Sequence, residues 1–127
     1  MFKDTKAFSG FSVDSIEKAR QFYGETLQLE VTRDEEMNIL QLHISGGNDI
    51  MVYEKPNHTP ATFTILNFPV SNIEQAVEKL KAAGVQFESY DFPDLKTDED
   101  NISRGGGPLI AWFTDPAGNI LSVLETE

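Results

Sequence analysis

Two residue types that often carry covalent or metal chemistry, cysteine and histidine, are absent or scarce in this chain. Cysteine is absent, which excludes thiolate ligands, disulfides and cysteine nucleophiles, and histidine occurs only at His43 and His58. His43 lies in an alternating, strand-like run, where it could bind a ligand, transfer protons near neutral pH, or be an ordinary half-exposed histidine. His58 lies in a proline-flanked stretch and is expected to be solvated. A metal triad of His43, His58 and Glu54 is disfavoured, because the three do not share one strand face.

Three other side chains could contact an organic ligand. Trp112, the only tryptophan, and Tyr53 could stack on an aromatic compound, although both could equally belong to a core. Arg104 could reach a ligand carboxylate or be a solvated loop arginine. It lies in the segment Pro93–Gly107, which is acidic and long for a hairpin connection. Such a segment could act as a lid over a ligand.

The elements that must position these residues come from an internal repeat. The spacing of Val, Ile, Glu and Ala at Val13, Ile16, Glu17 and Ala19 recurs at Val70, Ile73, Glu74 and Ala76. An alternating run comes first in each copy, at Ala7–Val13 and at Phe63–Val70. The repeat predicts two copies of one structural module.

Each alternating run is followed by the pattern of an amphipathic helix. The apolar faces consist of Ile16, Ala19, Phe22 and Tyr23 in the first helix and Ile73, Ala76, Val77 and Leu80 in the second. A polar residue with glutamate three positions later predicts each helix start, at Asp14 with Glu17 and at Ser71 with Glu74. Gly84 is predicted to end the second helix.

Strand patterns follow each helix. They cover Leu29–Arg33, Ile39–Ile44 and Ile50–Tyr53, and then Val85–Phe92, Leu109–Thr114 and Ile120–Leu124. The order β-α-β-β-β therefore occurs twice in a single domain of 127 residues, as module one (5–55), a linker (56–60) and module two (61–125). Because each sheet has a helix on one face only, its other face must cover something. The predicted fold is α+β, with two βαβββ modules forming a half-barrel of mixed sheet and helices on the outer face.

Two stretches resemble a known superfamily. The run Val13–Tyr23, continued by Gly24, is similar to the first-helix signature of the vicinal-oxygen-chelate superfamily of glyoxalases, extradiol dioxygenases and bleomycin-resistance proteins. Trp112–Asn119, with its Asp-Pro-Ala-Gly-Asn turn, is similar to the last hairpin of that superfamily. The resemblance covers nearly the whole chain and is closest to small bacterial glyoxalase-like proteins. It implies the fold, whereas the superfamily spans several reactions.

The resemblance also locates the four strand positions at which metal-dependent members hold a divalent ion. Those positions fall on Phe8, Met51, Ile65 and Ser122. Phenylalanine and isoleucine offer no lone pair, methionine is too soft for the ions these enzymes use, and serine is a weak ligand. A register error of one residue repairs none of them. The chain is therefore expected to bind no metal and no cofactor.

Strand alternation predicts which residues line the central cavity. The apolar and aromatic residues are Phe8, Met51, Tyr53, Ile65 and Trp112, and the polar ones are Gln41, His43, Asn67 and Ser122, with Arg104 reaching in from the lid. Such a mixture suits an organic ligand that a few hydrogen bonds orient.

Three functions remain open at this stage. The first is a metal-free protein that binds a small, partly aromatic compound. The second is a metal-dependent enzyme of the glyoxalase or extradiol-dioxygenase type, which would need the missing ligands. The third is a structural or interaction module whose cavity is filled by Phe8, Met51 and Trp112. No catalytic residue can be assigned from the sequence.

The composition limits the classes of partner that the chain is expected to bind. The net charge of −11 repels phosphate backbones and disfavours nucleic-acid binding. No apolar run approaches the roughly 18 residues of a membrane span, and no signal region is evident. A cytoplasmic protein is expected. Open edge strands and the usual behaviour of the resembling superfamily favour a homodimer.

Overall fold

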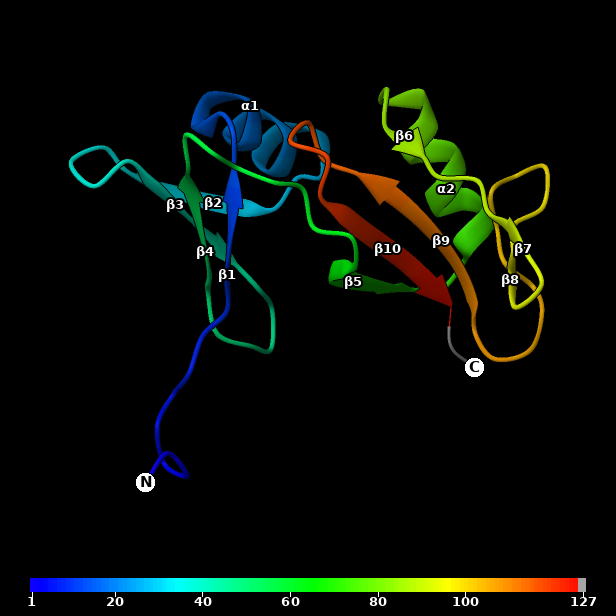
Figure 1. The fold of residues 1–127 in the computed structure, drawn as a ribbon, viewed down its shortest axis with the longest axis horizontal. Helices are drawn as coiled ribbons and strands as arrows, with labels where there is room; N and C mark the ends of the chain where they lie inside the picture. Colours follow the sequence, from blue (N-terminus) through cyan, green and yellow to red (C-terminus); the bar gives the residue numbers. More distant parts are fainter. Residues whose placement is uncertain (126–127) are drawn as a thin grey trace. The chain divides into compact units, whose positions relative to one another are not determined.

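The computed structural model describes residues 1–125 and divides the chain into two compact units (Figure 1). The first unit ends at Pro60 and the second begins at Ala61. The division falls at the end of the segment predicted as a linker. Among residues 1–125, no helix is long and apolar enough to cross a membrane.

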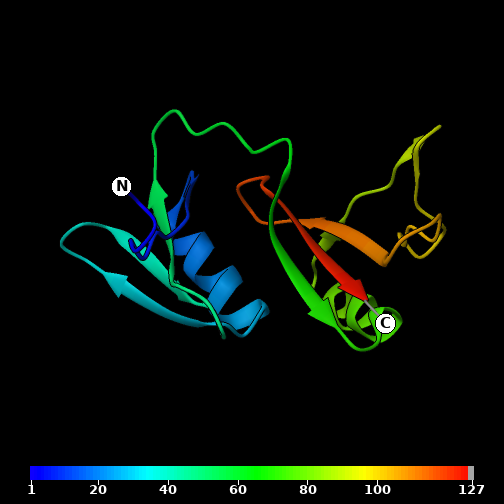
Figure 2. The same ribbon diagram turned by 90° about the horizontal axis from the view of Figure 1, so that it is seen from below.

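Module one is a four-stranded mixed sheet with a helix on one face. Its elements are β1 (Gly10–Val13), α1 (Ile16–Arg20), the π-helical turns η1 (Gln21–Thr26), β2 (Glu30–Asp34), β3 (Ile39–His43) and β4 (Ile50–Glu54). The strand order is β1-β4-β3-β2, in which β1 runs parallel to β4 and the other pairs are antiparallel. Helix α1 packs against β3 and β4 (Figure 2).

Module two repeats this arrangement. Its elements are β5 (Thr64–Val70), α2 (Ile73–Ala82), β6 (Gln86–Phe87), β7 (Asp91–Phe92), β8 (Leu95–Lys96), β9 (Leu109–Thr114) and β10 (Ile120–Glu125). The strand order is β5-β10-β9-β6, again with one parallel pair, β5 with β10, and α2 packs against β9 and β10. Strands β7 and β8 form a separate hairpin between β6 and β9. The predicted α+β class with two βαβββ modules is confirmed.

The core of each module lies between its sheet and its helix. In module one the buried residues are Val13, Ile16, Ala19, Phe22, Tyr23, Leu40, Leu42 and Val52. In module two they include Ile73, Val77, Ala111, Phe113, Leu121 and Val123. These are the helix-facing positions that the two periodicities predicted, and each large side chain buried there contributes about 1.5–3 kcal/mol. The remaining strand positions point away from the helix and form an open face on each sheet.

The predicted helix starts are wrong by one residue. The N-caps are Ser15 and Asn72, whose side chains accept hydrogen bonds from the amides of Lys18 (3.3 Å) and Gln75 (3.0 Å). Both caps have extended backbone, so the residue before each of them lies outside the helix. The glutamates of the predicted capping boxes therefore occupy the second helical position. The end of α2 is as predicted, because Gly84 has φ +90° and Val85 N donates to Leu80 O (3.0 Å).

Two predicted strands are shorter than expected. The first begins at Gly10 and not at Ala7, although Ser9 O still accepts a hydrogen bond from Met51 N (3.0 Å). The predicted strand Val85–Phe92 is interrupted after Phe87, and its last two residues pair with β8 instead. As a result, the segment predicted as a lid contains an ordered hairpin strand and a short bridge to β9.

Candidate functional site

The open face of module one contains a row of four residues from its four strands. Cross-strand partners point to the same side of a sheet, and the register pairs Gly10 with Met51, Met51 with Gln41, and Gln41 with Thr32. A Cβ on Gly10 would lie 3.2 Å from Met51 O, so glycine permits this close approach of β1 to β4. The row places an apolar thioether beside an amide.

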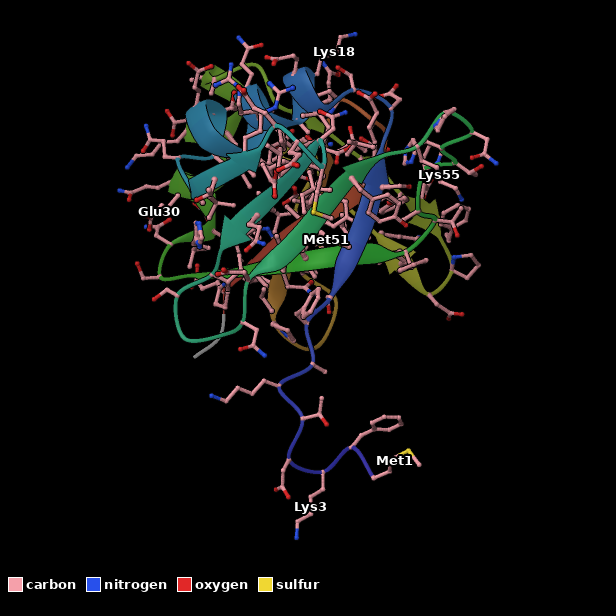
Figure 3. All side chains as sticks on the ribbon, turned by 90° about the vertical axis from the view of Figure 1, so that its left-hand side faces the viewer. Met1, Lys3, Lys18, Glu30, Met51 and Lys55 are labelled. Atoms are coloured by element: carbon pink, nitrogen blue, oxygen red, sulfur yellow. The ribbon has the colours of Figure 1, made fainter. Side chains whose placement is uncertain are left out.

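A hollow of about 280 Å³ lies on this face. Its lining residues are Lys6, Phe8, Gln41, Asn48, Asp49 and Met51. Phe8 lines the hollow and remains 65% exposed. Asn48 Nδ2 donates to Ala7 O (2.6 Å), which ties the segment before β1 to the hairpin between β3 and β4. Figure 3 shows Met1 and Lys3 at the end of a segment that extends away from the sheet carrying Met51. Three predicted site residues, Phe8, Gln41 and Met51, therefore meet here.

His43 lies near this hollow, but both of its ring nitrogens have hydrogen-bond partners within module one. Its Nε2 is 2.6 Å from Thr32 Oγ1, and its Nδ1 is 3.0 Å from Asp49 Oδ1. A ligand would have to displace one of these partners to bind the ring. Neither Thr32 nor Asp49 was predicted as a site residue from the sequence. Thr32 could have been found from the alternation of β2, since it shares the open face with Gln41, whereas Asp49 lies in a turn without periodicity.

Tyr53 and His58 lie at the other end of the same face. Tyr53 is 37% exposed and pairs with Ser12 of β1. His58 Nδ1 is 2.7 Å from Ser12 Oγ, because the chain after β4 returns toward β1. The expectation of a solvated His58 is therefore wrong. The ring is half-buried and helps to fix the end of the module.

The open face of module two is more polar at the matching positions. Ser122 pairs with Trp112 on one side and with Asn67 on the other. Ser122 is fully buried, and its hydroxyl donates to Asn67 Oδ1 at 2.5 Å. Ile65 lies where the register between β5 and β10 shifts by one residue, which marks a β-bulge. Ile65 therefore lies outside the regular strand pairing that connects Asn67, Ser122 and Trp112.

Trp112 belongs to an aromatic cluster that the sequence analysis missed. The Tyr90 ring lies edge-on to Trp112 at 5.4 Å between centroids, and Phe92 lies 6.3 Å from Tyr90. Burial, assisted by the negative charge of Glu88, raises the pKa of the Tyr90 hydroxyl. Phe92 remains 58% exposed. The Tyr-x-Phe spacing in the segment before β8 was the available signal, because it places both rings on one side of an extended chain.

Arg104 is not brought to the open face. Its Nε donates to Asp98 Oδ2 (2.7 Å) and a terminal nitrogen donates to Glu74 Oε1 (3.4 Å). Glu74 belongs to α2, which covers the opposite face of the sheet from Trp112. The Arg104 guanidinium and the Ile102 amide hold the pKa of the Asp98 carboxyl below its usual value. Arg104 therefore fixes the loop against α2.

Comparison with known proteins identifies the family. Residues 8–123 match the sequence model of the Glyoxalase/Bleomycin resistance protein/Dioxygenase superfamily, and the chain belongs to that superfamily. No curated protein matches the chain significantly.

Solved structures share the fold across nearly the whole chain. One is a member of the same superfamily from Sphaerobacter thermophilus DSM 20745 (21% identity, TM-score 0.70, covering 99% of this chain and 100% of that one). A second is TnmS3, an antibiotic binding protein from Streptomyces sp. CB03234 (20% identity, TM-score 0.68, 100% and 99%). A third is a glyoxalase/bleomycin resistance protein from the same Streptomyces (20% identity, TM-score 0.62, 94% and 99%). At these identities the likeness shows the fold alone.

The residues at the four positions where the family resemblance predicts metal ligands do not fit a divalent ion. Phe8 and Met51 offer one thioether in module one, and Ile65 and Ser122 offer one hydroxyl in module two, which donates its proton to Asn67. Within residues 1–125, no three or more histidine, aspartate or glutamate side chains gather where they could hold a metal. We therefore derive no chemistry through a metal ion at these positions.

Proposed function

We propose that this chain is a binding protein for a small, partly aromatic organic compound. The observation that carries the proposal is the hollow of about 280 Å³ on module one. The Phe8 ring and the Met51 thioether give it apolar walls, while Gln41 offers an amide donor and acceptor. Lys6, Asn48 and Asp49 add polar and charged groups, so the lining is mixed. A concavity with convergent polar groups is the usual form of a small-molecule site, and this volume suits a ligand smaller than most drugs.

Module two supports the same class of ligand through a different surface. The cluster of Trp112, Tyr90 and Phe92 offers aromatic faces, which stack on planar compounds with a gain of about 0.5–1.5 kcal/mol beyond the area buried. The antibiotic-binding description of TnmS3, a protein of the same fold, agrees with this ligand class. Phe8 lines the hollow of module one without filling it, which favours a binding protein over an interaction module with a filled cavity.

Binding is proposed to be independent of metal, because the four family positions carry Phe8, Met51, Ile65 and Ser122. Elemental analysis of untagged protein, purified without chelator, should find no stoichiometric iron, manganese, nickel or zinc. One tightly held ion per chain would contradict the proposal and favour the metal-dependent enzyme.

A homodimer in the cytoplasm is also proposed. Strands β1 and β5 are edge strands in the two sheets, and unpaired strand edges favour association with a second copy. Sedimentation at high micromolar concentration should give a mass of two chains. A monomer at that concentration would contradict the proposal. The absence of cysteine is in keeping with a reducing compartment.

The binding experiment uses neutral coumarins and naphthoquinones, with calorimetry as the readout for the hollow and Trp112 fluorescence as the readout for the aromatic cluster of module two. Gln41→Ala should weaken a hit about 5-fold, since one hydrogen bond contributes about 1 kcal/mol. Phe8→Ala should weaken it by about 10-fold through lost apolar area. Met37→Ala, at an exposed methionine in the turn after β2, is the matched control and should change nothing. Absence of any hit at millimolar concentration, or hits that ignore Gln41 and Phe8, would refute the hollow as the site.

A further inference from the structure

Three side chains on the open face of module one form a continuous chain of hydrogen bonds. Asp49 Oδ1 lies 3.0 Å from His43 Nδ1, and His43 Nε2 lies 2.6 Å from Thr32 Oγ1. Because a carboxylate can only accept, Nδ1 carries the proton of the neutral ring. Nε2 must then accept, and the Thr32 hydroxyl donates to it. This order of hydroxyl, imidazole and carboxylate is the one that activates a hydroxyl for nucleophilic attack.

Strands β2 and β3 hold Thr32 and His43 in place. In the register of β2 with β3, Thr32 lies opposite Gln41 and His43 lies opposite Glu30. Thr32 and His43 are therefore diagonal neighbours on one face, a separation that long side chains can bridge. The hairpin between β3 and β4 returns Asp49 to the far side of the imidazole. The direct cross-strand partner of His43 on β2 is Glu30, which is also charged.

The hydrogen-bonded chain of Thr32, His43 and Asp49, called the relay below, borders the hollow already described. Asp49 and Gln41 both line that hollow, and Gln41 is the direct cross-strand partner of Thr32. A carbonyl compound lying against Gln41 would place its carbon beside the Thr32 hydroxyl. The carboxamide of Gln41 is a donor for the negative charge that develops on the carbonyl oxygen. The His43 side chain is 31% exposed and that of Asp49 is 43% exposed, so water reaches the relay.

We propose that Thr32, His43 and Asp49 form an acyl-transfer site for small activated esters. Thr32 Oγ attacks the carbonyl carbon while its proton moves to His43 Nε2. The bond from the carbonyl carbon to the leaving oxygen then breaks, the leaving group departs as a phenolate, and His43 releases the proton to solvent. His43 Nε2 then takes a proton from a water molecule, whose oxygen attacks the carbonyl carbon of the threonyl ester. The bond from that carbon to Thr32 Oγ breaks, His43 returns the proton to Thr32 Oγ, and the acyl group leaves as a carboxylic acid that loses its own proton to solvent. Asp49 is a positioning residue that holds the ring in the required tautomer.

The test uses the full chain with p-nitrophenyl acetate. Release of p-nitrophenolate gives the rate, and peptide mass mapping locates the acetyl group. We expect the acetyl ester on Thr32, its loss in Thr32→Ala and Thr32→Val, and its retention in Thr32→Ser. His43→Gln should slow acylation about 10²-fold, the usual contribution of a general base. Asp49→Asn should lower kcat, and Asp49→Glu should restore part of it.

The chain contains a matched control in its second histidine. His58 also contacts a hydroxyl, that of Ser12, and His58→Gln should leave the rate and the site of acetylation unchanged. Acetyl groups found only on lysines or on Ser12, or an unchanged rate in His43→Gln with native circular dichroism, would overturn the proposal. It does not rest on the proposed ligand. Coumarin binding to the unsubstituted chain without acetylation of Thr32 would sink this inference alone, and acetylation of Thr32 without coumarin binding would sink only the binding function.

Discussion

Two glutamates at strand ends should stabilise the two helices, and their removal is the sharpest test of the repeat. Oε1 of Glu54, the last residue of β4, accepts a hydrogen bond from Ile16 N at 2.9 Å. Oε2 of Glu125, the last residue of β10, accepts one from Ile73 N at 2.8 Å. Each module thus ties the start of its helix to the strand that runs parallel to its first strand. Both glutamates act on the first helical amide, which has no partner within the helix.

The expected cost follows from these contacts. A hydrogen bond to a charged group contributes about 1.5–3 kcal/mol when shielded, and a charge at an exposed helix N-terminus contributes about 0.3–1 kcal/mol. Glu54 is exposed and Glu125 half-buried, so Glu→Ala should cost about 1 kcal/mol at the first and up to about 2 kcal/mol at the second. Glu→Gln keeps an acceptor oxygen but loses the charge, so it should cost about half as much.

Urea and thermal unfolding of the single and double variants measure these costs. One kcal/mol should lower the Tm by about 3–5 °C in a chain of this length. The double variant should show the sum of the single effects, since the two bonds share no partner. Glu36→Ala, in the exposed turn after β2, is the control and should stay within about 0.5 kcal/mol of the parent. If Glu54→Ala and Glu125→Ala were as mild as this control, the assigned capping role would be refuted.

Three further predictions concern stability. Gly84→Ala should lower the free energy of unfolding, measured in urea, by about 1 kcal/mol, because φ is +90° there. No atom lies within 4 Å of the added Cβ, so no steric clash increases this cost. Leu42→Ala should cost about 2–5 kcal/mol through the cavity left behind, with an unchanged circular dichroism spectrum in water; a loss below 1 kcal/mol would place Leu42 outside the core. Hydrogen bonds from Arg33 and Arg20 lower the pKa of Glu17 in the folded protein below its usual 4.5. The stability that these contacts add is therefore fully present above pH 4.5 and is lost as the pH falls through the pKa of Glu17 in the folded protein. Glu17→Gln should flatten this acid-side loss in urea midpoints, and an unchanged slope would show that the contacts are too exposed to matter.

The fold could be predicted because each element has a periodicity that burial imposes. Tyr23 and Leu42 belong to series with the helical and strand periods, and both are fully buried. The C-terminus of α2 was equally predictable, because a left-handed residue after the last turn favours glycine, as at Gly84.

The site was less predictable because it depends on register and on irregular loops. His43 was correctly placed on the open face, but its partners Thr32 and Asp49 depend on how β2 and a turn align with β3. Arg104 was expected at the ligand, whereas the local fold of the acidic loop turns it toward Glu74 on α2. The helix caps were displaced because Asp14 and Ser15 both have acceptor side chains, and the composition does not determine which one has extended backbone.

The repeat also bears on how this protein can change over generations. Gly10 and Asn67 occupy equivalent places in the two copies, and their parallel partners are Met51 and Ser122. One copy uses that place for a close approach of two strands, and the other uses it for a hydrogen bond between side chains. A duplicated unit whose core is secured separately in each half can exchange the chemistry of one face while the other stays fixed. Substitutions on one open face can therefore accumulate without loss of the core of the other module.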